Sequence, residues 1–170
     1  SLASSTVSGG GGTSITATYS QSYSTYKYTT SGWVAVSSNR SNINVLKLRE
    51  SINYFTGTES VLMCDGTNTP AKFDSSSFTE HTVSDDSSPA GASMTTDFKN
   101  HQFYAGFPSS GLGENKLLFS EPNVDNRFRA ASGAGSINVG FNITGIAKFR
   151  DSLYIFGKDK IKRLTGRHII

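Results

Sequence analysis

The sequence of 170 residues has one cysteine, four prolines and few charged side chains. A single cysteine excludes an internal disulfide and any zinc site built from several cysteines. No apolar run approaches the roughly 18 residues that a membrane-spanning helix needs, so no membrane partner is expected. Charged residues are 17% of the chain, against about 25% in a typical soluble domain. The net charge of +3 is too small to indicate nucleic-acid binding by itself.

The residues that are abundant favour strands over helices. Serine and threonine together fill roughly a quarter of the chain, and there are 17 glycines. These residue types are poor helix formers. The 11 phenylalanines and 7 tyrosines supply enough large side chains for a core, which argues against a disordered chain.

The first residues differ in composition from the rest. Residues 1–14 are rich in serine and glycine, with four glycines in a row at 9–12, which is typical of a flexible linker. We expect residues 15–170 to form one all-β, propeller-like segment. No signal peptide follows Ser1, and residues 167–170 look like the beginning of another strand, so we expect part of a longer chain.

Short runs with period 2 predict the strands. Tyr26 and Tyr28 alternate with polar residues, and similar runs occupy 15–20, 33–36 and 43–48. Serine, asparagine and glycine separate these runs, as in turns. We expect no α-helix of ten or more residues within 15–166, and a polar loop at 84–93.

A degenerate internal repeat refines this expectation. Phe98–Gly106 resembles Phe149–Gly157 at an offset of 51 residues, and each segment reads aromatic, basic, Asn or Asp, apolar run, glycine. A weaker copy begins at Phe55. Units of about 40–50 residues with several strands are typical of β-propeller blades. About three and a half such units fit, so we predict antiparallel β-meanders that form part of a β-propeller, with a β-sandwich as the alternative.

The two repeat segments should occupy equivalent positions in successive meanders. In the last unit we expect strands at 146–149, 153–156 and 160–164, separated by turns. The exposed residues should include Lys158, Lys160 and Lys162. The residues that we expect to be mostly buried are Leu62, Phe103, Phe119, Leu153, Ile155 and Leu164.

Several motifs resemble virion structural proteins of tailed bacteriophages. They are the 61–73 segment with its Asp-Gly-Thr-Asn-x-Pro core at 65–70, the segment 143–166, and between them a Phe-basic-Asn strand, a Leu-Phe-Ser-Glu strand, Phe128 and 136–140. Over residues 55–166 the chain is similar to virion proteins of phages that infect cyanobacteria. It is more distantly similar to tail-nozzle and head-to-tail stabilisation proteins.

The resemblance implies a role in the virion. Members of that wider group carry β-propellers and assemble as rings at the neck or tail. It therefore implies other virion structural proteins as partners, a homo-oligomeric ring, and a location in the virion. It offers no catalytic residue, cofactor or metal ligand to carry over, so we expect a protein that is not an enzyme and needs no cofactor.

Nucleophilic catalysis is weakly indicated. His81, His101 and His168 are present, but no Gly-x-Ser-x-Gly motif accompanies them, so we interpret them as surface or turn histidines. Cys64 lies within an apolar run and has no histidine near it in sequence. We interpret it as a small buried hydrophobic residue.

The carboxylates have simple structural interpretations. Asp85 and Asp86 lie in the expected polar loop, and Glu114 follows a Gly-Leu-Gly segment; a glycosidase would need two carboxylates facing one pocket. The segment 65–68 has oxygen ligands at its first and fourth positions. Because the next acid is Asp74, we expect a turn held by Asp and Asn side chains rather than a calcium loop.

The end of the chain is basic. Residues 141–170 carry seven Lys and Arg residues against two Asp residues. This pattern predicts either a positive surface facing an acidic neighbour or DNA, without sequence specificity, or an exposed outer strand that its charges protect from pairing. The candidate contact surface consists of Lys158, Lys160, Lys162, Arg163 and Arg167.

Two functions follow from these observations. The first is a non-enzymatic structural component of a bacteriophage particle, in the tail, neck or head-to-tail connection, that acts by assembly. The alternative is a carbohydrate-binding or glycan-processing propeller of a secreted bacterial protein, whose tyrosines and tryptophan stack on sugars. The alternative requires acids and aromatic residues that converge on one concave site, whereas the first requires broad contact with neighbouring chains.

Overall fold

The computed structural model describes residues 22–36, 40–41, 48–83, 85–108, 112–166 and 168–169. The chain divides into two compact units, 1–43 and 44–170. The expected linker at 1–14, the strand at 15–20 and nearly all of the run at 43–48 lie outside the described residues.

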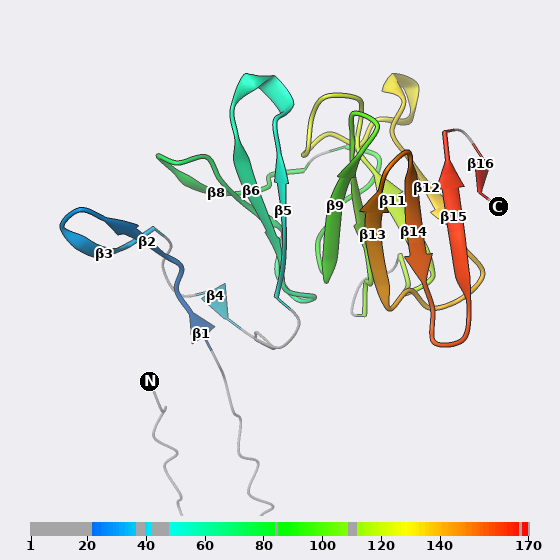
Figure 1. Ribbon diagram of the computed structural model, residues 1–170, viewed down its shortest axis with the longest axis horizontal. Helices are drawn as coiled ribbons and strands as arrows, with labels where there is room; N and C mark the ends of the chain where they lie inside the picture. The colour runs from blue at the N-terminus through cyan, green and yellow to red at the C-terminus, as the bar shows by residue number, and fades with distance from the viewer. Residues whose placement is uncertain are drawn as a thin grey trace, which may run out of the picture. The chain divides into compact units, whose positions relative to one another are not determined.

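The described part of the first unit consists of two strand pairs (Figure 1). Strand β1 (Ser22–Tyr23) pairs with β4 (Arg40–Ser41), and β2 (Tyr26–Thr29) forms a hairpin with β3 (Gly32–Ala35). In the hairpin Tyr28 lies opposite Trp33, and their rings meet edge to face with centroids 5.3 Å apart. Tyr28 and Trp33 are both exposed, so this hairpin presents an aromatic surface.

The second unit contains three antiparallel meanders of four strands each, which follow one another in chain order. The first comprises β5 (Arg49–Asn53), β6 (Ser60–Cys64), β7 (Ala71–Phe73) and β8 (Phe78–Glu80). The second comprises β9 (Met94–Phe98), β10 (His101–Ala105), β11 (Lys116–Phe119) and β12 (Gly135–Asn138). The third comprises β13 (Gly145–Phe149), β14 (Ser152–Phe156), β15 (Ile161–Thr165) and β16 (His168–Ile169).

The prediction of an all-β chain is confirmed. The described residues contain no α-helix, only the short 3-10 helices η2 (Phe55–Gly57) and η3 (Ala130–Ser132). None of their helices is long and apolar enough to cross a membrane. The expected strand at the end of the chain is β16, which pairs with β15.

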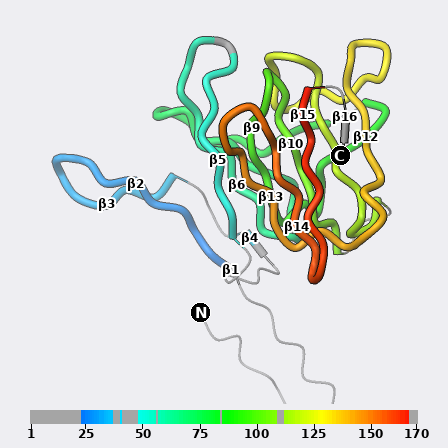
Figure 2. The backbone as a smooth tube through the Cα atoms, turned by 45° about the vertical axis from the view of Figure 1, so that its right-hand side comes forward, coloured from blue at the N-terminus to red at the C-terminus, as the bar shows by residue number. Residues whose placement is uncertain are grey.

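The three meanders pack against one another through their faces. The first strand of the second meander, β9, contacts both β5 and β13, the first strands of its neighbours (Figures 1 and 2). One apolar core, which includes Leu62, Tyr104 and Phe128, lies between the first and second meanders. A second core, which includes Phe103, Leu117 and Ile155, lies between the second and third. The second meander is therefore buried on both faces.

The internal repeat is confirmed in register. Phe98 pairs with His101 at the end of the first hairpin of its meander, and Phe149 pairs with Ser152 at the same point of the next. Lys99 and Asn100 have φ of 46° and 65°, as both central residues of a type I′ hairpin turn require. The offset of 51 residues thus relates structurally equivalent positions.

The earlier copy was placed two residues away from its true position. Asn53 pairs with Ser60, so Asn53 is the residue equivalent to Phe98. Phe55 lies in η2, within the connection 54–59. In the first meander the connection between the first two strands, residues 54–59, is longer than the two-residue turn of the second meander. The spacing between Phe55 and Phe98 therefore does not relate equivalent positions.

Most of the burial predictions are confirmed. Leu62, Leu153 and Ile155 are fully buried, and Phe103 and Leu164 nearly so. Phe119 is half-buried at the edge of the core between the second and third meanders.

We expect Leu153→Ala to lower the free energy of unfolding by about 2–5 kcal/mol, because the substitution leaves a cavity in a closed core. Denaturant unfolding followed by circular dichroism, at fixed protein concentration, measures the change. Lys160→Ala, at an exposed position in the turn before β15, is the control and should change stability by less than about 0.5 kcal/mol. An equally small loss for Leu153→Ala would place β14 at the periphery.

Candidate interaction surfaces

The predicted basic surface is divided between two sides of the third meander. Lys158 and Lys160 are exposed in the turn before β15, and Arg163 is exposed on the strand itself. Lys162, expected to be exposed, is half-buried, with its amine 5.9 Å from the ring centre of Phe141. Successive residues of a strand point to opposite faces, so Lys162 and Arg163 cannot serve one surface. Arg167 lies outside the described residues.

The interpretation of β15 as an outer strand is wrong for its last two residues. Leu164 pairs with Ile169 and Thr165 with His168, so β16 covers the end of that edge. Lys162 and Arg163 precede these paired positions in β15. Lys158, Lys160 and Arg163 remain as the exposed part of the predicted contact surface.

The two faces of each meander can be distinguished by register. We call the side turned to the following meander the forward face, and the side turned to the preceding meander the rear face. Leu62 and Phe103 lie on the forward faces of the first and second meanders, and both are buried. Tyr104 and Ile155 lie on the rear faces of the second and third meanders, and both are fully buried.

The forward face of the third meander is largely exposed within the part of the chain that the structure describes. By the same register, Tyr154 is equivalent to the buried Phe103, yet it is only half-buried. Its cross-strand partner Arg163 is exposed. Ile161, which pairs with Phe156, is 64% exposed, and Phe149 is 59% exposed. This face is therefore apolar, with one positive charge.

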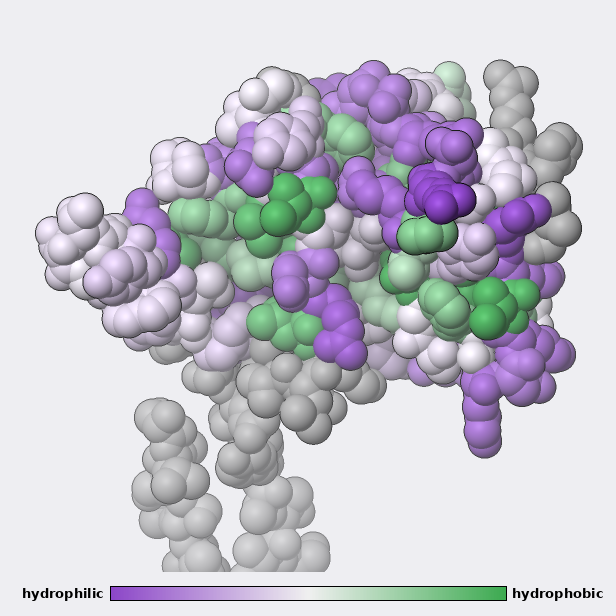
Figure 3. Space-filling model, in the orientation of Figure 1, coloured by the Kyte–Doolittle hydropathy of each residue, from purple (hydrophilic) through white to green (hydrophobic). Residues whose placement is uncertain are grey.

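The rear face of the first meander is also apolar. One cross-strand row runs through all four strands and consists of Ile52, Val61, Phe73 and Phe78. Ile52 is 52% exposed, and the other three are half-buried. The next row begins and ends with exposed carboxylates, in the order Glu50, Met63, Ala71 and Glu80. Hydrophobic patches between hydrophilic residues are visible on the molecular surface (Figure 3).

A groove of about 580 Å³ lies where the first turns of the three meanders meet. Tyr54, which is 66% exposed, and Asn100 and Asn123 are among its lining residues. Lys148 donates to both carboxylate oxygens of Asp97 at 2.7 Å, which joins β13 to β9. The carboxylate of Asp97 is therefore already paired with the amine of Lys148 within the groove.

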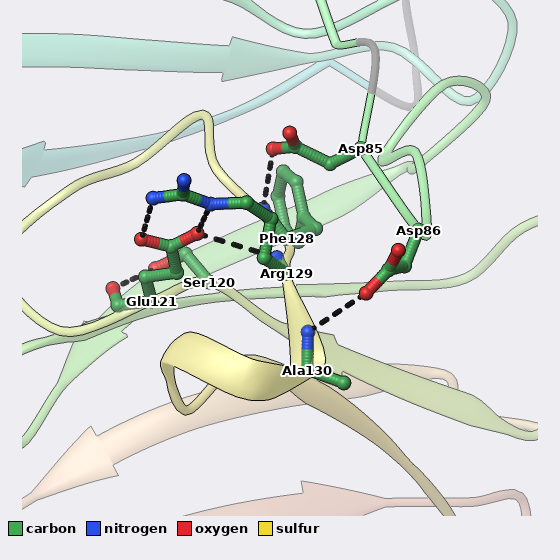
Figure 4. A network of polar contacts seen from close by, with 7 residues as sticks. All are labelled: Asp85, Asp86, Ser120, Glu121, Phe128, Arg129 and Ala130. Carbon is green, nitrogen blue, oxygen red and sulfur yellow. Dashed lines mark hydrogen bonds and ion pairs between the residues drawn. The ribbon is translucent and has the colours of Figure 1, made fainter.

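The predicted polar loop at 84–93 has a role that its sequence did not reveal. Asp85 accepts a hydrogen bond from the backbone N–H of Phe128 at 2.8 Å, and Asp86 accepts one from that of Ala130 at 2.9 Å (Figure 4). Between these two anchors, Arg129 donates to both oxygens of Glu121 at 2.6 and 2.9 Å. The acids thus hold the segment that carries Phe128 into the core.

The ion pair between Arg129 and Glu121, at the centre of this network, affects the pKa of Glu121. The hydrogen bond from the Arg129 guanidinium lowers the pKa of Glu121 below its ordinary value. Glu121 is only 7% exposed, and its buried carboxylate has the hydrogen-bond partners that such a group needs. Sequence analysis missed this pair because its members are separated by a loop rather than by a regular strand or helix spacing.

The candidate nucleophiles and bases are engaged within the fold. His81, interpreted as a surface or turn residue, is buried, with its Nε2 3.1 Å from the hydroxyl oxygen of Tyr104. That hydroxyl donates to the backbone oxygen of Asp125 at 2.6 Å, and burial raises the pKa of Tyr104 well above its ordinary value. His101 is half-buried, with Nδ1 2.6 Å from the backbone oxygen of Ser120. Cys64 is buried in the core between the first two meanders, as expected.

The segment 65–68 forms the expected side-chain-held turn. One carboxylate oxygen of Asp65 accepts hydrogen bonds from the backbone N–H groups of Thr67 and Asn68, and the other accepts from the Asn68 side chain at 2.8 Å. Gly66 supplies the positive φ of 79° that this turn requires. Across the described ranges, no group of three His, Cys, Asp or Glu residues is placed to hold a metal ion.

Comparison of the sequence with known proteins finds no related protein. No protein-family model matches the chain, and no curated protein matches its sequence. The resemblance to phage virion proteins stays a prediction, based on the motifs in residues 55–166.

We expect acidification to weaken the Glu121–Arg129 pair. Because folding lowers the pKa of Glu121, its stabilisation is complete above the ordinary glutamate value of about 4.3 and is lost as the pH falls from there through the lowered pKa. Glu121→Gln should therefore lower the melting temperature at pH 7, and the difference from the wild type should shrink at acidic pH.

Arg129→Lys should act in the same direction, because lysine cannot reproduce the bidentate contact. Arg127→Lys, at an exposed position two residues away, is the matched control and should leave the melting curve unchanged. Thermal unfolding of all four proteins at several pH values measures these effects. A difference between wild type and Glu121→Gln that stays constant with pH would contradict the assignment.

Proposed function

We propose that the chain is a structural component of a bacteriophage particle, in the tail, neck or head-to-tail connection. It acts by assembly with other virion subunits, and its three meanders are successive blades of a β-propeller. The motifs of residues 55–166 point to the virion, and the arrangement of the meanders supports the rest.

The double burial of the second meander supports a propeller over a sandwich. In a two-layer sandwich each sheet packs against the core with one face. Here Tyr104 is buried on one side of β10 and Phe103 on the other, each in a different core. In a propeller, four-stranded blades follow one another around a centre and every blade packs on both sides. The contacts of β9 with β5 and β13 fit blades joined through their first strands.

The observation that carries the assembly role is the exposed apolar forward face of the third meander, at one end of this series. The paired residues of its strands correspond to those of the forward face of the second meander, which is buried against the third. A contiguous apolar face on a protein surface marks an interaction site or an aggregation hazard. Ile161 and Phe149 on this face are each more than half exposed and call for a covering partner.

The groove favours a second candidate, carbohydrate binding. Exposed Tyr54 could stack on a sugar ring, and the amides of Asn100 and Asn123 could bond its hydroxyls. Of the two acids that line it, Asp97 is already bound by Lys148, whereas Asp151 is exposed. Acids and aromatic residues thus meet in one concave site, as that function requires.

In particles of the virus that encodes this chain, the protein should occupy a defined position in the tail or neck. It should bury more than about 1,000 Å² against other chains, the usual size of a specific interface. Ile161→Asp should abolish incorporation, whereas the neighbouring Lys160→Asp should not. Reconstruction of purified particles, with circular dichroism to check folding, measures this. Normal incorporation of the Ile161→Asp variant would contradict a role for this face.

Glycan-binding measurements separate the two candidates. For a structural component we expect no saturable binding of a defined oligosaccharide by the purified chain in calorimetry. Binding that is lost in Tyr54→Ala, and kept in Tyr26→Ala as the exposed control outside the groove, would favour the second candidate. Turnover of a glycan, abolished by one substitution that leaves the fold intact, would overturn the structural role.

A further inference from the structure

We propose that, in the assembled particle, a β-meander of a neighbouring subunit covers the forward face of the third meander. This partner packs aliphatic side chains on the face and places a carboxylate opposite Arg163. The inference rests on the proposed function, because it treats the face as an assembly surface. It adds the fold and the charge of what covers that surface.

No residue on this face of β13, β14 and β15 is buried within the part of the chain that the structure describes. Phe149 and Ile161 are 59% and 64% exposed, Arg163 is exposed, and Tyr154 and Phe156 are half-buried. The neighbouring strand β16 pairs with the edge of β15, so it extends the sheet and does not lie over the face. A contiguous apolar face of this kind marks an interaction site or an aggregation hazard.

The second meander shows the same kind of face in its closed form. By the register of the two sheets, the apolar residues Phe149, Tyr154, Phe156 and Ile161 correspond in this order to Phe98, Phe103, Ala105 and Leu117. Those four residues of the second meander are buried, in the core that also contains Leu153, Ile155 and Leu164. A forward face in this protein is therefore covered by another meander, which contributes aliphatic side chains.

One position departs from this pattern and indicates the charge of the partner. Arg163 pairs with Tyr154 as Phe119 pairs with Phe103, so an arginine replaces a phenylalanine at the edge of the closed core. Within the described ranges Arg163 belongs to no ion pair. Covering the face takes part of the guanidinium out of water, which is costly without an opposite charge. A carboxylate supplies that charge and can accept two parallel hydrogen bonds from arginine.

The forward face of a second copy does not meet this requirement. The residues that β13, β14 and β15 present on this side include Arg163 and no carboxylate. Two such faces brought together would contain two arginines and no opposite charge, which disfavours the contact. Both closed contacts within the chain also join a forward face to a rear face. We therefore expect a heterologous partner surface.

Substitutions of Arg163 test the charge of the partner, with the number of copies of the chain per purified particle as the measurement. Arg163→Leu is the decisive variant, because it puts an apolar side chain where Phe119 stands in the closed face. A partner without an acid would accept this variant, whereas a partner with an acid would be left with an unpaired carboxylate. Arg163→Lys keeps the charge. Lys158→Glu, in the turn before β15, is the control for a change of charge away from the face.

We expect Arg163→Leu to reduce the copies per particle at least tenfold, since it removes one partner of a desolvated charge pair. Arg163→Lys and Lys158→Glu should stay within about threefold of the wild type. Circular dichroism of each purified variant checks its folding. In a reconstruction of the wild-type particle, a β-sheet should cover Phe149 and Ile161, with a carboxylate within about 4 Å of the Arg163 guanidinium.

The outcomes separate this inference from the proposed function. Full incorporation of Arg163→Leu would overturn the inference, and so would a reconstruction in which the face is open, is covered by a helix or meets no carboxylate. In each of these cases the chain is still a component of the particle, and the proposed function stands. Absence of the wild-type chain from the particles would overturn both.

Discussion

The structure of residues 44–170 depends on one strand that is buried on both sides. In β10, Gln102 to Ala105 are all buried, because neighbouring side chains point into different cores. Phe103 contributes to the core shared with the third meander, and Tyr104 to the core shared with the first. A strand of this kind needs large side chains in succession rather than in alternation. Without it the outer meanders would have nothing to pack on.

Double burial brings polar groups into the interior, and each of them needs partners. Gln102 accepts a hydrogen bond from the Asn53 side chain across the first interface and donates to Thr95 within its own sheet. The segment that carries Phe128 also has its polar groups satisfied, by hydrogen bonds to Asp85 and Asp86 and by the Glu121–Arg129 ion pair. Removing one partner from such a group leaves its full desolvation penalty. These contacts therefore set the alignment of the meanders as well as contributing to their stability.

The same construction limits what the chain can do. An exposed apolar face remains at one end of the series, and a polar groove lies where its turns meet. The face suits a partner with a similar sheet surface, and the groove suits a small polar ligand. We propose assembly as the function because the exposed forward face of the third meander corresponds to a face that is closed elsewhere in the fold, whereas the groove has one of its two acids bound by Lys148.

The sequence by itself determined the strands, the turns and the repeat. Alternation, turn residues and the 51-residue offset depend on neighbours along the chain, so they predicted β13 to β15, the Asp65 turn and the equivalence of Phe98 and Phe149. The tertiary structure alone decided how the charged residues are used. Lys162 was separated from Arg163 because a face of β15 packs on the second meander, and Asp85 and Asp86 became anchors because a distant loop brings Phe128 and Ala130 to them. Such contacts depend on packing between segments, which local sequence patterns do not encode.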